Sequence, residues 1–172
     1  MLANPPFSIL FVCLGNICRS PLAEGIMRSV AEERGMERQV LVDSAGTGGW
    51  HAGSAPDARS IAIAARHGID ISGQQARKVV AEDFDRFNLI LGMDQSNTDE
   101  LRALAPARAQ GRIHLFLELA SGRSNEVPDP YYGGERGFAD VYRMIRDGSE
   151  GLADRLGWRV LAALSGQASS TT

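Results

Sequence analysis

The chain has 172 residues, of which 44% are hydrophobic and 23% charged, and it carries a formal net charge of −3. This length fits one domain with a sizeable core, and the slightly acidic balance argues against non-specific binding to nucleic acid or to an anionic membrane surface. No apolar run approaches the roughly 20 residues that span a bilayer, and the N-terminus lacks the basic region of a secretory signal. We therefore expect a cytoplasmic protein with one domain at 1–165 and a polar tail at 166–172.

Hydrophobic periodicity predicts strands that alternate with helices. In chain order, the predicted elements are a strand at 8–13, a helix at 20–34, a strand at 40–46, a helix at 54–68, a strand at 87–94, a helix at 96–106, a strand at 112–119 and a helix at 137–164. Residue types that favour helix ends set the starts: Ser54 or Asp57 would cap the second helix and Ser96 the third.

This alternation predicts an α/β fold, with a four-stranded parallel sheet flanked by helices on both faces. Sheets of this kind bind ligands outside the carboxyl ends of their strands, at the point where the strand order reverses. The first predicted strand ends at Cys13. The loop that follows it therefore lies where this architecture places chemistry.

The loop after the first strand belongs to the segment VCLGNICRSP, residues 12–21. Gly15 and Asn16 tolerate a positive φ, which a tight loop requires. Ser20 followed by Pro21 is typical of a helix start, with Ser20 as the cap. Such a loop can turn its backbone N–H groups inward, and a helix N-terminus adds partial positive charge. The segment thus predicts an anion-binding cradle.

A thiol and a guanidinium flank this cradle. Arg19 can donate a fork of hydrogen bonds to two oxygens of a phosphate, and Cys13 would then face the phosphorus atom. Cationic surroundings and a helix N-terminus favour the thiolate form of a cysteine, which is the nucleophile. We therefore predict thiolate attack that forms a phosphocysteine, which water then hydrolyses. The alternative is that Cys13 is an ordinary buried cysteine at a strand end.

Several segments resemble, in the same order, those of the low-molecular-weight protein tyrosine phosphatases. They are VCLGNICRSPLAE, DSAGTGGWHAG, RHGIDISGQQARKV, LGMDQSN and DPYYGG. The resemblance implies a Rossmann-like phosphotyrosine phosphatase I fold and the hydrolysis of phosphotyrosine in proteins, and of small aryl phosphates, without a cofactor. It implies that the phosphate-binding loop consists of Leu14, Gly15, Asn16, Ile17, Cys18, Arg19 and Ser20.

The same resemblance assigns the remaining parts of the site. It selects Asp129 as the general acid that protonates the leaving phenolate, a role that spacing along the chain does not show. It places the aromatic walls and the floor of the cleft at Trp50, Tyr131, Tyr132, Leu14 and Ile17. Taken alone, Trp50 could instead anchor its own loop, and the two tyrosines could be ordinary exposed aromatic residues.

Behind the loop, the resemblance implies a hydrogen-bond network of Asn16, Ser20 and Ser44, in which Ser20 also donates to the thiolate. The sequence departs from the family at Gln74, where many members carry a histidine that partners the acid matching Glu24. An amide can still form hydrogen bonds, but it cannot be a cation. We expect this change to affect the rigidity of the loop and not the reaction.

Cys13 and Cys18 are the two cysteines of the chain. Two cysteines are too few for a disulfide scaffold or for a structural zinc site, so we expect a reduced protein with no metal. Cys18 on its own could be a small buried filler. Family members with a second loop cysteine are expected to form a disulfide after oxidation, so the resemblance predicts a protective Cys13–Cys18 bond.

Other functions fit the same loop less well. Thiol-dependent arsenate reductases need a relay of further cysteines, and none follows Cys18. Phosphoarginine phosphatases tend to carry threonine at the position of Ile17. An inactive phosphate-binding module would not need Cys13, Arg19 and Asp129 together, and no nucleotide-binding G-x-x-x-x-G-K-[ST] motif is present. The expected partners are phosphotyrosine-containing proteins, and the expected state is a monomer with weak self-association at most.

Overall fold

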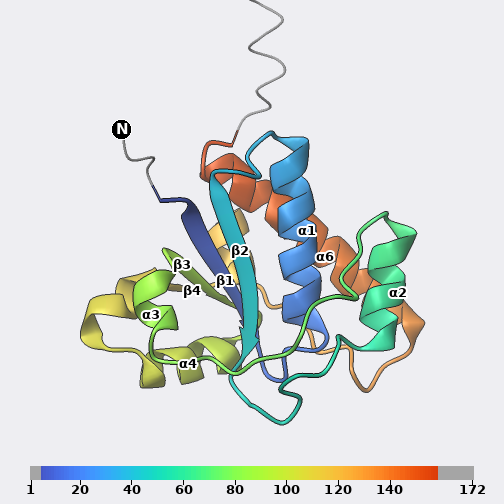
Figure 1. The fold of residues 1–172 in the computed structure, drawn as a ribbon, viewed down its shortest axis with the longest axis horizontal. Helices are drawn as coiled ribbons and strands as arrows, with labels where there is room; N and C mark the ends of the chain where they lie inside the picture. Colours follow the sequence, from blue (N-terminus) through green and yellow to red (C-terminus); the bar gives the residue numbers. More distant parts are fainter. Residues whose placement is uncertain (1–4, 159–172) are drawn as a thin grey trace, which may run out of the picture.

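The structure is a computed structural model that describes residues 5–158. Four parallel strands form one sheet in the order β2-β1-β3-β4, as Figure 1 shows. The strands are β1 (Phe7–Cys13), β2 (Val40–Gly46), β3 (Leu89–Gly92) and β4 (Ile113–Leu115). The helices are α1 (Arg19–Glu33), α2 (Ala58–Arg66), α3 (Asp83–Arg86), α4 (Gln95–Leu104), α5 (Phe116–Ser121), α6 (Glu135–Arg155) and the 3₁₀ helix η1 (Ala107–Arg112).

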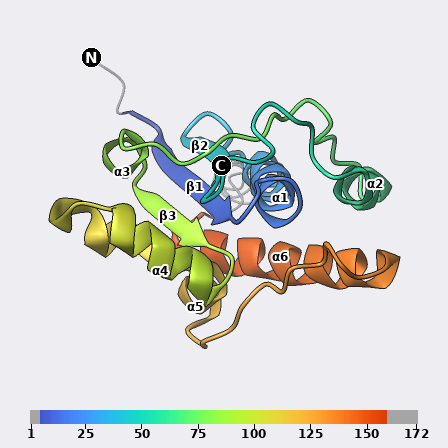
Figure 2. The same cartoon turned by 90° about the horizontal axis from the view of Figure 1, so that it is seen from below.

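Side chains of β1 alternate between two hydrophobic cores, as the period of two along a strand requires. Ile9 and Phe11 pack in the core that α1, α2, α5 and α6 cover. Leu10 and Val12 pack in the core on the other face, which contains residues of α3, α4 and η1. Helices therefore cover both faces of the sheet, and Figure 2 shows the strands between these two layers. The predicted fold class is confirmed.

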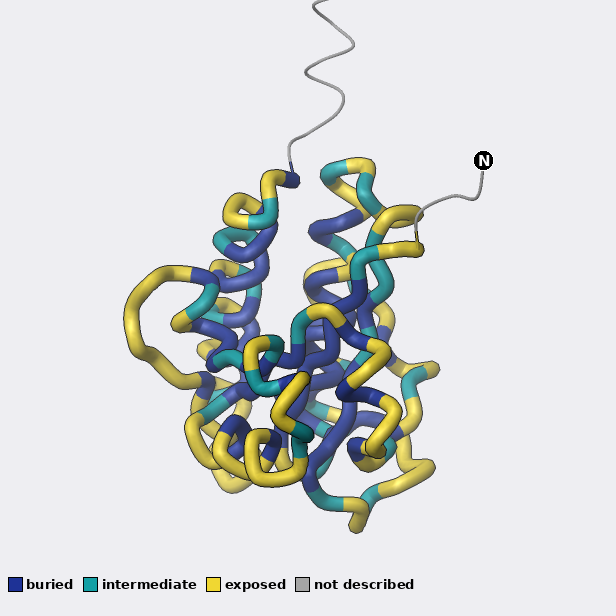
Figure 3. The backbone as a smooth tube through the Cα atoms, turned by 90° about the vertical axis from the view of Figure 1, so that its left-hand side faces the viewer, coloured by how far each residue is buried: buried dark blue, intermediate teal, exposed yellow. Residues whose placement is uncertain are grey.

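Strand order places the first loop at a reversal point. β1 lies between β2 and β3, so the chain leaves β1 toward one edge of the sheet and later returns to its other side. Crevices for ligands open at such points. In Figure 3, buried backbone runs through the middle of the molecule and exposed segments lie in the surrounding loops. None of the helices within residues 5–158 is long and apolar enough to cross a membrane.

The predicted strand at 112–119 is wrong in its second half. β4 ends at Leu115, and α5 begins at Phe116. The apolar run favours a buried element of either type, and the packing decides for a helix. Phe116 and Leu117 approach α6 at Gly148, where an added Cβ would lie 2.9 Å and 2.7 Å from them. Gly148 thus lets α5 pack closely against α6 and does not break that helix.

Three predicted helix starts are tested by the structure. Asp57 caps α2 by accepting a hydrogen bond from Arg59 N, which decides between the two predicted caps. α4 is capped by Asp94, not Ser96, in a capping box with Asn97. The remaining prediction, Ser20 as the cap of the first helix, is wrong.

The first helix begins at Arg19, before the predicted cap residue Ser20. The residue at the N-cap position of α1 is Cys18, and no side chain caps the helix there. The side chain of Ser20 is engaged elsewhere, by the thiol of Cys13. The last predicted helix, 137–164, is observed as Glu135–Arg155, and residues 159–164 and the tail at 166–172 lie outside the described residues. The short helix α3 and the 3₁₀ helix η1 were not predicted.

Candidate active site

The loop between β1 and α1, residues 13–20 and here called the phosphate loop, follows the central strand of the sheet. Asn16 has a φ of +56°, and within residues 5–158 it is the sole non-glycine residue with a positive φ. A short polar side chain tolerates this conformation well. Gly15 lies close to His51, whose Cδ2 would be 3.0 Å from an added Cβ. Asn16 thus supplies the turn, and Gly15 supplies room.

The guanidinium of Arg19 is buried and held from several sides. Its Nη1 donates to Asp94 Oδ2 at 2.6 Å and to the carbonyl of Val127 at 3.0 Å. Its Nη2 lies 3.7 Å from Asp129 Oδ2. Only 3% of the Arg19 side chain is exposed. The Arg19 side chain is thus already ordered before a ligand binds, so binding costs little further side-chain entropy. Its guanidinium is placed to donate to a phosphate.

A chain of hydrogen bonds begins at the thiol of Cys13. Ser20 Oγ lies 3.0 Å from Cys13 Sγ and accepts from Asn16 Nδ2 at 2.8 Å. The same amide donates to Ser44 Oγ at 3.0 Å, and Asn16 Oδ1 accepts from the backbone N–H of Arg77 at 2.9 Å. Ser20 Oγ accepts from Asn16, so its own hydrogen can be donated to the sulfur of Cys13, which is nearer than the alternative acceptor, the carbonyl of Ala45 at 3.4 Å.

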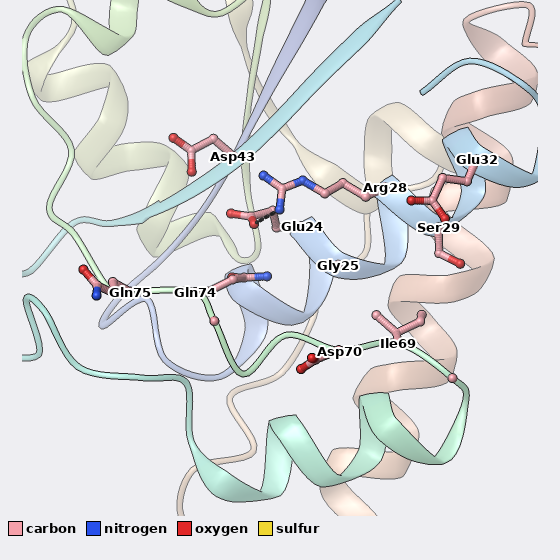
Figure 4. A pocket seen from close by; sticks show the side chains of 12 residues that line it. Glu24, Gly25, Arg28, Ser29, Glu32, Asp43, Ile69, Asp70, Gln74 and Gln75 are labelled. Atoms are coloured by element: carbon pink, nitrogen blue, oxygen red, sulfur yellow. Dashed lines mark ion pairs between the residues drawn. The ribbon is translucent and has the colours of Figure 1, made fainter. Parts of the chain in front are cut away.

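This series of hydrogen bonds ends at Glu24, which borders a polar cavity of about 500 Å³ lined by residues of α1, β2 and the segment 68–75. Ser44 Oγ donates to Glu24 Oε1 at 3.0 Å, and Arg28 pairs with the other oxygen at 2.7 Å. Figure 4 shows Glu24 and Arg28 facing each other in this cavity. Burial raises the pKa of Glu24 to about 7, against the opposing effect of Arg28.

Asp129 lies in an exposed loop, residues 127–134, here called the acid loop. Asp129 Oδ1 accepts the backbone N–H of Tyr131 at 3.0 Å, while Oδ2 faces Arg19. The side chain is 42% exposed. Pro128 and Pro130 flank it, and each restricts the backbone at its own position and at the residue before it. The carboxyl group is therefore held near the phosphate loop and open to solvent.

These two loops and the segment around Trp50 enclose one cleft of about 200 Å³. Its lining consists of Cys13, Leu14, Gly15, Ile17, Cys18, Arg19, Trp50, His51, Asp129, Tyr131 and Tyr132. Trp50 is 74% exposed, and its ring lies over Gly48, where an added Cβ would meet it at 1.7 Å. Tyr131 and Tyr132 pack edge to face at 5.0 Å. The structure thus gathers the residues expected for catalysis and for the walls around one opening.

The family model for low molecular weight phosphotyrosine protein phosphatase matches residues 8–161. The chain belongs to this family. A low molecular weight phosphotyrosine protein phosphatase of Schizosaccharomyces pombe is 44% identical over 144 residues, which cover 83% of this chain and 92% of the relative. The low molecular weight protein-tyrosine-phosphatase YfkJ of Bacillus subtilis is 43% identical over 146 residues, or 84% and 92% of the two chains.

Solved structures agree. A crystal structure of a protein tyrosine phosphatase from Entamoeba histolytica matches with a TM-score of 0.84 at 38% identity, over 88% of this chain and 97% of that one. The resemblance inferred from the sequence segments is confirmed. Because the chain belongs to this family, positions at which its sequence differs from the usual residue of the family can now be examined in the structure.

Gln74 is one such departure. Its Nε2 donates to the carbonyl of Pro21 at 3.0 Å, and its Oε1 has no hydrogen-bond partner among residues 5–158. Within the same residues, no hydrogen bond joins Gln74 to Glu24, which pairs with Arg28 instead. The Gln74 amide therefore supports the first turn of α1, and Arg28 is the residue that pairs with Glu24.

Cys18 is buried beside Cys13 in the phosphate loop, and both thiols are free. Burial raises the pKa of the Cys18 thiol to about 12, and nearby Asp57 adds to the effect. Cys18 therefore stays protonated at neutral pH. Its carbonyl accepts a hydrogen bond from Ser60 Oγ at 3.2 Å, which attaches the loop to α2.

Sequence reasoning missed Asp94 as a part of the site. Its Oδ1 caps α4 through Asn97 N at 2.8 Å, and its Oδ2 fixes Arg19. A signal existed, because Asp94 follows the strand next to β1, and the carboxyl ends of neighbouring parallel strands meet at one edge. His51 also lies in the wall of the cleft.

Proposed function

We propose that this chain hydrolyses phosphotyrosine in proteins, and small aryl phosphates, through a phosphocysteine on Cys13. The observation that carries the proposal is the convergence of Cys13, Arg19 and Asp129 on one cleft, with Arg19 held at both Asp94 and Val127. A nucleophile, an anion clamp and an acid are the three groups that this reaction needs.

In the first step, the phosphoryl group sits in the backbone cradle with Arg19 forked onto two of its oxygens. The hydrogen bond from Ser20 and the start of α1 stabilise the Cys13 thiolate. The sulfur forms a bond to phosphorus, the bond from phosphorus to the tyrosine oxygen breaks, and the carboxylic acid of Asp129 gives its proton to that oxygen. The products are tyrosine and phosphocysteine.

In the second step, water attacks the phosphocysteine. The carboxylate of Asp129 takes a proton from the water, the sulfur–phosphorus bond breaks, and Cys13 returns as a thiolate. The oxygen of the water stays bonded to phosphorus, and inorganic phosphate leaves the site. Ser20 favours this departure because its hydroxyl is placed to donate to the leaving sulfur. As written, neither step calls for a metal or a cofactor.

The shape of the cleft supports a planar aromatic substrate. Trp50 and Tyr132 line the opening with exposed fractions of 74% and 94%, and Tyr131 packs edge to face against Tyr132. Aromatic pairs of this kind add about 0.5–1.5 kcal/mol each beyond their buried area. A phosphotyrosine side chain reaches past these rings to the loop, whereas phosphoserine is shorter. The proposal includes a cytoplasmic location and a monomeric enzyme with weak self-association at most.

The test is a comparison of substrates. We expect the wild-type chain to hydrolyse p-nitrophenyl phosphate and phosphotyrosine peptides, and to leave matched phosphoserine and phosphoarginine peptides largely uncleaved. Rapid acid quenching followed by mass spectrometry should find one phosphate on the peptide that contains Cys13. Equal kcat/KM values for phosphoserine and phosphotyrosine peptides, or phosphoarginine as the preferred substrate, would contradict the proposal.

A further inference from the structure

Arg59, in the first turn of α2, is placed between the two halves of the site. Its Nε and Nη2 donate to the two carboxylate oxygens of Asp57, both at 3.0 Å. The same guanidinium donates to two backbone carbonyls of the acid loop, that of Tyr131 at 3.0 Å and that of Gly133 at 3.1 Å. Figures 1 and 2 show α2 beside the start of α6, where the acid loop enters that helix.

The Asp57 side of this arrangement is attached to the phosphate loop. The backbone N–H of Asp57 donates to the carbonyl of Ile17 at 2.7 Å, and Ser60 binds the carbonyl of Cys18. Hydrogen bonds from Arg59 lower the pKa of Asp57, so its carboxylate stays ionised and keeps the guanidinium in place. Arg59 therefore joins the acid loop to the phosphate loop through the N-terminus of α2.

Aromatic rings complete the seat of Arg59. The centre of its guanidinium lies 4.5 Å from the ring centroid of Phe138 on α6 and 5.6 Å from that of Tyr131. A planar guanidinium can stack on such rings while donating in its own plane, which an ammonium cannot do. The position thus uses the properties of arginine and not only its charge.

We propose that Arg59 is a positioning residue for the general acid, which it holds at the leaving oxygen by fixing the Tyr131–Gly133 backbone. The inference rests on the proposed role of Asp129. The carboxyl group is coupled to this backbone because Tyr131 N donates to Asp129 Oδ1. A displacement of about 1 Å in a catalytic group can cost about 10²-fold in rate.

Arg59 is not itself a residue of either hydrophobic core, although its guanidinium lies over the ring of Phe138, which belongs to one of them. The first half of the acid loop has attachments of its own, because Arg19 donates to the carbonyl of Val127 and lies 3.7 Å from Asp129, and Val127 N donates to the carbonyl of Met93. Removing Arg59 therefore frees the second half of the loop while the nucleophile and its clamp keep their contacts. The expected defect concerns proton transfer and not phosphate binding.

The experiment measures kcat/KM for aryl phosphates whose leaving groups range from phenol to 2,4-dinitrophenol. This ratio reports the step that forms phosphocysteine, in which the acid acts. We expect Arg59→Ala to lose about 10²-fold with phenyl phosphate and at least about tenfold less with 2,4-dinitrophenyl phosphate, which needs little protonation. Arg59→Lys should fall between wild type and Arg59→Ala. Arg66→Ala, an exposed position at the other end of α2, is the matched control and should resemble wild type.

Asp129→Asn and the double variant separate the possible failures. If Asp129→Asn shows the same dependence on the leaving group and Arg59→Ala adds less than about threefold to it, the two residues act in one step. A uniform loss across leaving groups in Arg59→Ala, or no loss, overturns the inference while leaving the acid intact. A uniform loss in Asp129→Asn overturns the role of the acid and the inference with it. Thermal unfolding of each variant shows whether the fold is retained.

Discussion

The phosphate loop and the acid loop contribute to the same cleft, but they are held in opposite ways. In the phosphate loop, Cys13, Asn16 and Arg19 are buried and form hydrogen bonds to several elements. In the acid loop, Val127 and Pro130 are buried, and the other residues are exposed. The phosphate loop is held by hydrogen bonds at many points before substrate arrives, whereas the acid loop is fixed at a few points, chiefly by arginine side chains.

This difference separates two parts of catalysis. The phosphate loop must surround a dianion with donors that do not reorganise, because preorganised dipoles are the main source of electrostatic stabilisation. The exposed loop must bring a proton to the leaving group and later take one from water, so solvent access is an advantage. Changes in the first loop should harm all substrates alike. Changes in the second should depend on the leaving group.

The largest expected effect is that of Cys13→Ser. A serine hydroxyl at this position is too weak a nucleophile at neutral pH, so turnover of p-nitrophenyl phosphate should fall below detection. The backbone cradle and Arg19 remain, so calorimetry should still detect binding of inorganic phosphate. Activity within about tenfold of wild type would contradict covalent catalysis by Cys13.

Asp129→Asn should be the next most severe change. A general acid contributes roughly 10²–10⁴-fold, and we expect a loss of this size in kcat/KM with phenyl phosphate. The loss should shrink steadily as the leaving group becomes a weaker base. A loss that is equal for all leaving groups would remove Asp129 from this role.

Oxidation tests the phosphate loop in another way. Peroxide should convert Cys13 to a sulfenic acid, peroxide being reduced to water, and the thiol of Cys18 should then displace water to form a disulfide. Because burial raises the pKa of Cys18 to about 12, this second reaction should accelerate as the pH rises above neutral.

The variant Cys18→Ser separates this protective role from that of a buried filler. It should keep most of its activity, yet it should recover poorly with dithiothreitol after peroxide, whereas wild type recovers. Mass spectrometry of oxidised wild type should find the tryptic peptide that ends at Arg19 lighter by two hydrogens. Full recovery of Cys18→Ser, or the absence of that peptide, would leave Cys18 as filler. Inorganic phosphate should protect both proteins by occupying the cradle.

The network behind the phosphate loop should make stability depend on pH through Glu24. Its pKa is about 7 in the folded protein, raised by burial from 4.5. The folded state therefore holds the proton more tightly, so this contribution is full below about pH 4.5 and is lost as the pH rises through 7. Arg28 opposes the rise and Asp43 adds to it.

Urea unfolding at pH 5 and pH 8 measures this contribution. Between pH 5 and pH 8, wild type should lose more unfolding free energy than Glu24→Gln, and the difference should be on the order of 2 kcal/mol. Glu32→Gln, an exposed change on the same helix, should leave the difference unaltered and serves as the control. If wild type and Glu24→Gln lose the same stability, the Glu24 carboxyl is not the titrating group.

The smallest effects should come from the aromatic rim. Trp50→Ala and Tyr132→Ala should each lower kcat/KM for phosphotyrosine peptides about 2- to 10-fold, since each contact is worth about 0.5–1.5 kcal/mol. Phenyl phosphate, which lacks the flanking peptide, should be affected less. Leu104→Ala removes an exposed apolar side chain at the end of α4 and is the control. Equal losses for peptides and phenyl phosphate would mean that the two side chains contact the phosphorylated ring and not the flanking peptide, and no loss with either substrate would mean that they do not bind substrate.

Local sequence determined the nucleophilic half of this protein. Cys13 and Arg19 are joined by a loop too short to separate them, and the strand before it and the helix after it follow from hydrophobic pattern alone. Which segments form helices and which form strands, and the parallel direction of the sheet, also followed for most elements from the hydrophobic pattern and the alternation of strands with helices. Exceptions arose where an apolar run fits either element, as at α5, because only packing against α6 decides such a run.

Tertiary structure alone decided the other half. Asp94, Asp129 and Arg59 lie on different elements, and their approach to the phosphate loop depends on the strand order that places β3 beside β1 and on the path of the chain around α2 and α6. No spacing along the chain encodes these distances. Parallel strands bring remote residues together at one edge of the sheet, since each strand ends there and each helix begins there.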